Sequence, residues 1–163
     1  MSLLFLDQQP AIEKINFLSV DIGRAKLLVP MPAVAEIILN QRIEKSDRLP
    51  VWVRGWIVWR YLSIPLIDFR ALQDGLNASD FGSRTRVLVM KSFAEGHSHN
   101  NYAIMTRGFP YTLSVEADCE MTTQALNDNG KCIKIDLHLQ GKKFLLPNFT
   151  EIETYLKQIP RYY

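Results

Sequence analysis

The feature that most constrains the fold is the segment KCIKIDLHLQGKKFLLP, residues 131–147, near the end of the chain. Apolar residues there alternate with lysine, aspartate and histidine, so one face of an extended strand is apolar and the other is solvated. Gln140 and Gly141 suit a two-residue turn because glycine tolerates the positive φ that such turns need. The segment therefore predicts a β-hairpin. Its apolar face carries Ile133, Ile135, Leu137 and Leu139, and its polar face carries Lys134, Asp136 and His138.

Short apolar runs of strand length, separated by polar turns, occupy much of the remaining chain. Bounded runs of this kind predict strands. The run 31–39 begins with Pro32 near its start, where proline suits a first helical position, and predicts a helical turn that continues into a strand. Residues 114–130 show no clear period and predict a largely irregular segment. The other predicted strands lie at 15–20, 25–30, 56–59, 62–68, 86–93 and 102–107.

Two helical segments are indicated by the residues at their ends. Asp68 is a suitable N-cap and Gly75 a suitable stop for a short helical turn between them. Near the C-terminus, Asn148 precedes Glu151 by three residues, which is a variant of the capping box. Apolar residues then repeat at helical spacing, and we expect the face that they form to pack on the protein's own strands. That face consists of Ile152, Tyr155, Leu156 and Ile159.

The order of these elements predicts an all-β protein with nine or ten short strands and one C-terminal α-helix. The chain has 163 residues, of which 47% are hydrophobic, so it is long enough to bury a core, and one domain over 1–163 is expected. Its net charge of +2 lacks the basic excess that is typical of nucleic-acid-binding proteins.

The sequence also limits where the protein works. The first ten residues lack the features of a secretory signal, and no apolar run reaches the roughly 20 residues of a membrane helix. Cys119 and Cys132 are too few for a disulfide framework. We therefore expect a cytoplasmic protein with no direct membrane insertion and no nucleic-acid partner.

Signatures of catalysis are missing from the sequence. It contains no nucleophile elbow, phosphate-binding loop, dinucleotide fingerprint or zinc-protease motif. His97 and His99 could begin a metal site, but no third ligand lies nearby, so we expect a solvated loop. Acidic neighbours disfavour a thiolate at Cys119, and Cys132 is expected to be a small packing residue. We therefore expect no catalytic residue, no metal and no cofactor.

One nucleotide-binding signal stays open as an alternative. Residues 77–82, NASDFG, match half of the signature with which PilZ proteins bind cyclic di-GMP. The other half is a pair of arginines four residues apart, which grip guanine and phosphate groups. No upstream arginines have this spacing. A cyclic di-GMP-binding regulator of PilZ type is thus the alternative function.

The segment GWIVWRYLSIPLIDFR, residues 55–70, is largely apolar but contains Arg60, and an arginine rarely enters a core unpaired. Together with VAEI at 34–37, it resembles the CheW family of chemotaxis adaptors. The family places a glycine and an asparagine where this chain has Tyr61 and Val58, and its V-D-x-V run is absent here. The residues in register are Pro50, Gly55, Ile57, Arg60, Ile64, Pro65, Ile67, Asp68 and Arg70.

This resemblance implies a CheW-like fold, in which two small five-stranded β-barrels share a core and a C-terminal α-helix follows. Strand order then places subdomain one at roughly 24–85, and subdomain two at roughly 10–23 together with 86–147. The C-terminal helix would occupy 148–159.

The resemblance also implies a function without catalysis. A CheW-like adaptor couples methyl-accepting chemoreceptors to a CheA-type histidine kinase, in the cytoplasm beside membrane receptor arrays. The departures from the family pattern indicate a divergent member, similar to the adaptors of chemosensory systems that control twitching motility by type IV pili. Carried over by position, Val34, Glu36 and Arg60 would be partner-binding residues.

Two roles are open for Arg60. Its stem could lie along Trp59 and Tyr61 while the guanidinium faces a partner, an arrangement that binding hot spots favour. Alternatively, it could pair internally with Asp68 or Glu36 and only hold the turn.

Overall fold

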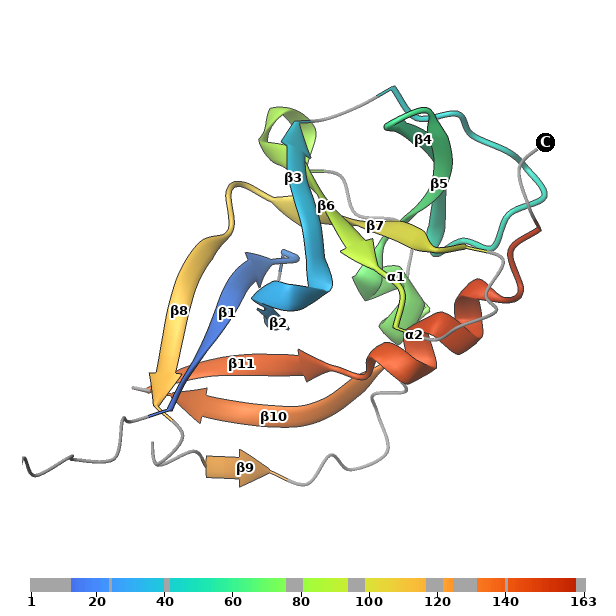
Figure 1. Ribbon diagram of the computed structural model, residues 1–163. Helices are drawn as coiled ribbons and strands as arrows, with labels where there is room; N and C mark the ends of the chain where they lie inside the picture. The colour runs from blue at the N-terminus through green and yellow to red at the C-terminus, as the bar shows by residue number, and fades with distance from the viewer. Residues whose placement is uncertain are drawn as a thin grey trace, which may run out of the picture.

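The computed structural model describes residues 13–23, 25–39, 42–75, 81–93, 99–116, 122–124, 132–139 and 141–160. Within these ranges, the strands form one six-stranded and one five-stranded sheet, and two α-helices pack beside them (Figure 1). In chain order the elements are β1 (Lys14–Asp21), β2 (Lys26–Pro30), η1 (Met31–Ala33), β3 (Val34–Leu39), β4 (Val53–Trp59), β5 (Leu62–Ile67), α1 (Phe69–Asp74), η2 (Gly82–Arg84), β6 (Thr85–Lys91), β7 (Asn101–Arg107), β8 (Tyr111–Glu116), β9 (Thr122–Gln124), β10 (Ile133–Leu139), β11 (Lys142–Pro147) and α2 (Phe149–Leu156).

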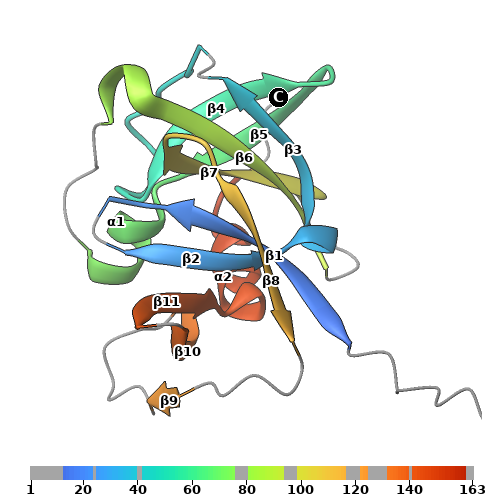
Figure 2. The same ribbon diagram turned by 90° about the vertical axis from the view of Figure 1, so that its left-hand side faces the viewer.

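The six-stranded sheet has the order β8-β1-β2-β11-β10-β9. Strands β1 and β2 form the predicted antiparallel pair, and the backbone N–H of Gly23 donates to Asp21 Oδ1 at 2.7 Å in their turn. The predicted hairpin of β10 and β11 is confirmed, with Leu139 opposite Lys142 across the turn. Strand β11 joins β2 in parallel, which brings the C-terminal hairpin beside the N-terminal one (Figure 2).

The five-stranded sheet has the order β3-β6-β7-β5-β4. The outer edge of β4 is held by Glu44, whose backbone N–H and C=O exchange hydrogen bonds with those of Trp56, both at 2.8 Å. This approach requires glycine at position 55. A Cβ on Gly55 would lie 2.3 Å from the Glu44 carbonyl oxygen, and the φ of +137° is one that other residues rarely adopt.

A shared core joins the two sheets. The largest group of buried apolar side chains draws on strands of both sheets and on both α-helices. The apolar face of α2 is buried in this group, through Ile152, Leu156 and Ile159, so its predicted packing is confirmed. Both predicted N-caps are confirmed as well: Asp68 Oδ1 accepts from Ala71 N–H at 3.1 Å, and Asn148 Oδ1 accepts from Glu151 N–H at 3.3 Å.

The predicted all-β, two-subdomain fold is confirmed, but the sheets are not closed barrels. In the part of the chain that the structure describes, backbone pairing ends at β8 and β9 in one sheet and at β3 and β4 in the other. The six-stranded sheet gains β9 from the segment that was predicted to be irregular, and β8 also overlaps that segment. Three residues of β9 pair with β10, which is too short a stretch for a period to show in the sequence.

The strands are divided between the sheets differently from the predicted subdomain boundaries. Strand β2 lies in the six-stranded sheet rather than in subdomain one, because a tight hairpin keeps it paired with β1. Strands β6 and β7 lie in the five-stranded sheet rather than in subdomain two, because β6 pairs along its length with both β3 and β7.

The C-terminal hairpin departs from strict alternation at Asp136. This residue was predicted on the solvated face, yet it is buried. Strand β10 lies between β9 and β11, and Lys143 of β11 places its Nζ 3.4 Å from Asp136 Oδ2. A buried carboxylate needs such a partner, so cross-strand pairing compensates for the break in the pattern.

Candidate protein-binding surface

The β4–β5 hairpin ends in a two-residue turn made by Arg60 and Tyr61, with Trp59 opposite Leu62 at its base. Both turn residues have positive φ, 46° for Arg60 and 65° for Tyr61, as type I′ turns require. Glycine or asparagine usually occupies such positions, since the left-handed conformation costs other residues about 1–2 kcal/mol each. The tip of this hairpin is therefore a strained feature that the rest of the fold must support.

The guanidinium of Arg60 lies at the surface, where two contacts order it. Its Nη2 is 3.6 Å from Glu36 Oε2, and its Cζ lies 4.7 Å from the centroid of the Trp59 ring. The same Glu36 oxygen accepts a 2.7 Å hydrogen bond from Trp59 Nε1. The Arg60 side chain nevertheless stays 67% exposed and that of Glu36 42% exposed. An exposed ion pair of this kind contributes about 0–1 kcal/mol, so little stability depends on keeping it intact.

These contacts bear on the two roles that the sequence left open for Arg60, stacking on its neighbours with the guanidinium free for a partner or pairing with an internal acid. The predicted stacking on Trp59 and the predicted pairing with Glu36 both occur. Asp68, the other acid considered, instead caps α1. The hydrogen bond between Trp59 and Glu36 also links β4 to β3, the two edge strands of the five-stranded sheet, through side chains.

Strand β3 positions Glu36 through a local irregularity. Its pairing with β6 shifts register between Val34, opposite Met90, and Glu36, opposite Val89. Such a bulge redirects the side chains that follow it. Val34 lies before the shift, is half-buried and packs against the shared core. The structure thus brings Glu36 and Arg60 together, whereas Val34 lies apart from their contact.

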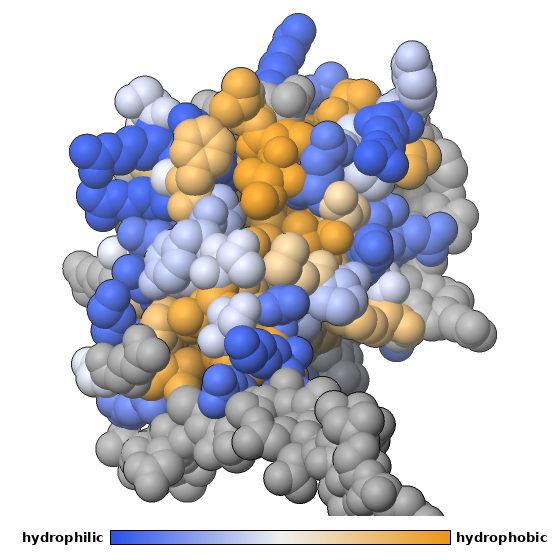
Figure 3. Space-filling view, turned by 60° about the vertical axis from the view of Figure 1, so that its left-hand side comes forward, coloured by the Kyte–Doolittle hydropathy of each residue, from blue (hydrophilic) through white to orange (hydrophobic). Residues whose placement is uncertain are grey.

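The strand and the hairpin that carry this ion pair also expose apolar side chains. Figure 3 shows hydrophobic side chains gathered in a band over β3, with hydrophilic groups on either side. Two exposed residues come from β3 and three from the hairpin, and with Glu36 and Arg60 they make up what we call the hairpin surface. Its apolar members are Ile37, Leu39, Val58, Tyr61 and Leu62. Sequence reasoning missed this exposure, although Ile37 and Leu39 stand at the alternate positions of one strand face.

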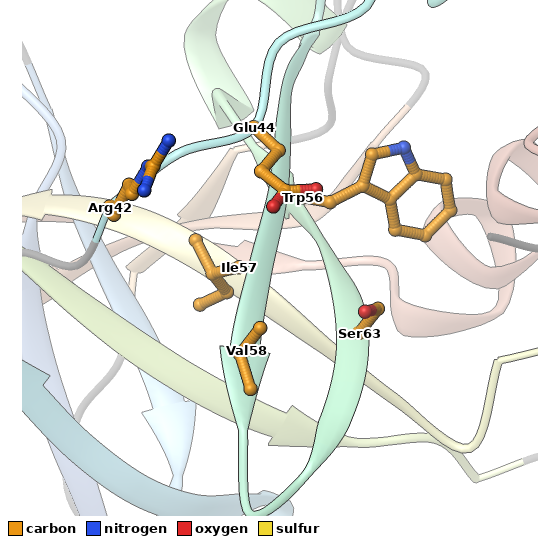
Figure 4. Close-up of a pocket in the computed structure, with 6 residues that line it drawn as sticks. All are labelled: Arg42, Glu44, Trp56, Ile57, Val58 and Ser63. Atoms are coloured by element: carbon orange, nitrogen blue, oxygen red, sulfur yellow. The ribbon is translucent and has the colours of Figure 1, made fainter. Parts of the chain in front are cut away.

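A shallow hollow lies beside the same hairpin, between the segment that contains Glu44 and strand β4. Figure 4 shows Arg42 and Glu44 on one side of it and Val58 and Ser63 on the hairpin strands. Trp56 and Ile57 complete the lining. The charged side chains that line this hollow are one guanidinium and one carboxylate, from Arg42 and Glu44.

The other candidate residues do not form a site within the described residues. His99 was predicted in a solvated loop, but it is buried: its Nε2 lies 3.1 Å from the Ile159 carbonyl oxygen and its ring 5.7 Å from that of Trp56. Cys132 is buried, as predicted. No group of three potential metal ligands occurs among the described side chains. His97, Cys119 and residues 77–80 of the PilZ-like half-motif lie outside the described ranges.

None of the helices in the described ranges is long and apolar enough to cross a membrane. A search of curated proteins returns no significant match. Among solved structures, the chain resembles the scaffolding protein TtCheW from Thermoanaerobacter tengcongensis, with a TM-score of 0.68 over 83% of this chain and 85% of that one. At 11% identity this likeness shows a common fold. A family model for the CheW-like domain matches residues 16–115, and the chain therefore belongs to the family of CheW-like domains.

Proposed function

We propose that this protein is a non-enzymatic signalling adaptor that couples methyl-accepting chemoreceptors to a CheA-type histidine kinase. Membership of the CheW-like family and the fold shared with a scaffolding protein support a chemotaxis signalling adaptor. The observation that carries the proposal for this chain is the exposed Glu36–Arg60 pair, with Arg60 stacked on Trp59, on a strand and a hairpin that also expose apolar side chains. An ordered arginine beside apolar and aromatic groups is typical of protein-binding hot spots.

The ion pair suggests how docking proceeds. Arg60 has further N–H donors beyond the one that faces Glu36, and a guanidinium binds a carboxylate best with two of them. A partner carboxylate could therefore replace or share the contact with Glu36 at small cost to the free protein. The neighbouring apolar side chains would then lose water on binding, which supplies most of the favourable free energy.

Finer assignments follow from the family and form part of the proposal. The adaptor would work in the cytoplasm, beside receptor arrays, in a chemosensory system such as those that control twitching motility by type IV pili. Val34, Glu36 and Arg60 are the proposed partner-binding residues. The exposed side chains of Glu36 and Arg60 support direct contact with a partner, whereas the half-buried Val34 would act through the shape of β3.

Calorimetric titration of the full chain with the regulatory domain of the CheA-type kinase from the same organism tests this function. We expect micromolar binding that Arg60→Ala weakens about tenfold, which is about 1.4 kcal/mol. Lys142→Ala is the control, because Lys142 is an exposed basic residue beside the turn of the C-terminal hairpin and lies on the other sheet. Absence of binding by the wild-type chain would contradict the proposal.

Calorimetric titration also distinguishes the adaptor from the alternative function, a cyclic di-GMP-binding regulator. A PilZ-type regulator would bind cyclic di-GMP with micromolar or tighter affinity, whereas the adaptor is expected to show no heat of binding. Saturable binding of the nucleotide, without binding of the kinase domain, would favour the alternative.

A further inference from the structure

Tyr61 combines two features that a residue with only a structural role would not keep. It is fully exposed, and it occupies the left-handed region with φ of 65°. A bulky residue in that region is a conformational outlier, and a glycine or asparagine would remove the strain. Within the described residues, the Tyr61 ring and hydroxyl make no hydrogen bond or aromatic contact that would offset the cost. Backbone strain that no contact within the protein offsets is characteristic of positions that take part in binding.

The surroundings of Tyr61 indicate what it would bind. Arg60 precedes it, fixed by Glu36 and by the Trp59 ring, and provides the charged group at the tip of the hairpin. Leu62 lies opposite Trp59 on the same face of the hairpin, is more than half exposed and carries no charge. An aromatic ring beside an ordered guanidinium and an apolar rim matches a protein surface with an apolar recess bordered by a carboxylate.

We propose that Tyr61 is the anchor that sets partner specificity, inserting its ring into an apolar recess of the kinase regulatory domain while Arg60 pairs with a carboxylate at the edge of that recess. This inference rests on the proposed adaptor function and names the residue and the chemistry of the contact. The type I′ turn fixes the direction of the Cα–Cβ bond of Tyr61, so the backbone presents the side chain outward before binding. Strain in the free hairpin thus serves to orient the anchor in advance.

The distinguishing prediction is that binding and stability change in opposite directions. Tyr61→Gly and Tyr61→Asn are compatible with positive φ, so the urea midpoint of each should be equal to or higher than that of the wild type. Both should bind the kinase regulatory domain about tenfold more weakly. Tyr61→Phe should bind nearly as well as the wild type, because the ring provides the buried surface. Tyr111→Ala, which removes a half-exposed tyrosine from an edge strand of the other sheet, should leave binding unchanged.

Calorimetry and urea unfolding of these four variants decide the inference. Weaker binding by both Tyr61→Gly and Tyr61→Asn, with unfolding midpoints that are retained or raised, would support it. Wild-type affinity in Tyr61→Gly, alongside weakened binding in Arg60→Ala, would overturn the role of Tyr61 and leave the adaptor function standing. Absence of binding by the wild type would overturn the proposed function, and the inference with it.

Discussion

Two hairpins of this protein have the same plan and different chemistry. In both, two residues connect antiparallel strands: Arg60 and Tyr61 between β4 and β5, and residues 140–141 between β10 and β11. Each hairpin also has a basic side chain near a carboxylate: Arg60 lies 3.6 Å from Glu36 of β3, and Lys143 lies 3.4 Å from Asp136 within the C-terminal hairpin.

The differences lie in the turn and in what is exposed. In the C-terminal hairpin, Gly141 takes the positive φ of 75°, and a Cβ there would meet nothing within 4 Å. Its apolar side chains Leu137, Leu139 and Phe144 are buried, and Asp136 is nearly so. In the β4–β5 hairpin, two residues other than glycine bear the positive φ, and the apolar side chains near the tip are exposed.

This contrast separates the requirements of folding from those of binding. Apart from the buried Asp136, the C-terminal hairpin follows local rules, with glycine in the turn and its apolar face covered, as expected where stability alone shapes a sequence. The β4–β5 hairpin breaks two of those rules at the same place. Natural proteins tolerate such violations mainly at functional sites, which agrees with the role proposed for the hairpin surface.

The largest expected effect comes from the base of the β4–β5 hairpin. Gly55→Ala forces a Cβ against the Glu44 carbonyl and adds strain at φ of +137°, so we expect a loss of about 4 kcal/mol or more in the free energy of unfolding. Urea unfolding measures it. Gly141→Ala is the matched control and should cost about 1 kcal/mol, since its surroundings are open. Equal losses in the two variants would show that the approach of Glu44 does not constrain this hairpin.

An exchange of turn residues tests the contrast itself. Gly141→Tyr introduces into the C-terminal hairpin the strain that Tyr61 bears, and it should lower the free energy of unfolding by about 1–2 kcal/mol. Tyr61→Gly should raise it by up to about 1 kcal/mol, because relief of strain is partly offset by the greater freedom of glycine in the unfolded chain. Equilibrium unfolding in urea gives both values. Destabilisation by both changes would mean that Tyr61 supports the fold.

The smallest effect at neutral pH concerns Tyr102, a buried counterpart to the exposed Tyr61. Burial raises the pKa of Tyr102 above its ordinary value of 10.0, and the nearby charge of Glu153 adds to the rise. Above about pH 10 the unfolded chain therefore releases this proton while the folded chain retains it, so stability falls as the pH rises. Tyr102→Phe should change stability by less than about 1 kcal/mol at pH 7, because its hydroxyl makes no hydrogen bond to the described residues.

Urea unfolding at pH 9 and pH 11 checks this prediction. The wild type should lose more stability between the two pH values than Tyr102→Phe does. Equal losses in the wild type and Tyr102→Phe would show that this hydroxyl does not contribute to alkaline unfolding.

Most of the correct fold predictions came from patterns among residues that are close together in the sequence. The C-terminal hairpin, the caps at Asp68 and Asn148 and the packing face of α2 each depend on residues close together in the chain, and all were predicted. The division of strands between the two sheets does not follow the expected subdomain boundaries, because it depends on pairing between segments far apart in the chain, as where β2 joins β11. His99 was misplaced for the same reason, since the carbonyl that holds it belongs to Ile159, at the far end of the chain.

The candidate site was predictable only in part. The family resemblance pointed to Glu36 and Arg60, and the sequence around Arg60 suggested its stacking on Trp59. The hydrogen bond from Trp59 to Glu36 joins residues 23 positions apart on different edge strands, and no sequence pattern signals it. The strain at Tyr61 depends on the backbone angles of a two-residue turn, which are set by the register of β4 against β5.

The most direct test of the account is to map the binding surface by NMR, recording backbone amide shifts of the isotope-labelled protein as the kinase regulatory domain is added. The account predicts that the largest perturbations fall on β3 and on the β4–β5 hairpin, around Glu36, Arg60 and Tyr61, while the amides of β10 and β11 change little. Perturbations concentrated on the β10–β11 hairpin, with the β4–β5 tip unchanged, would contradict it.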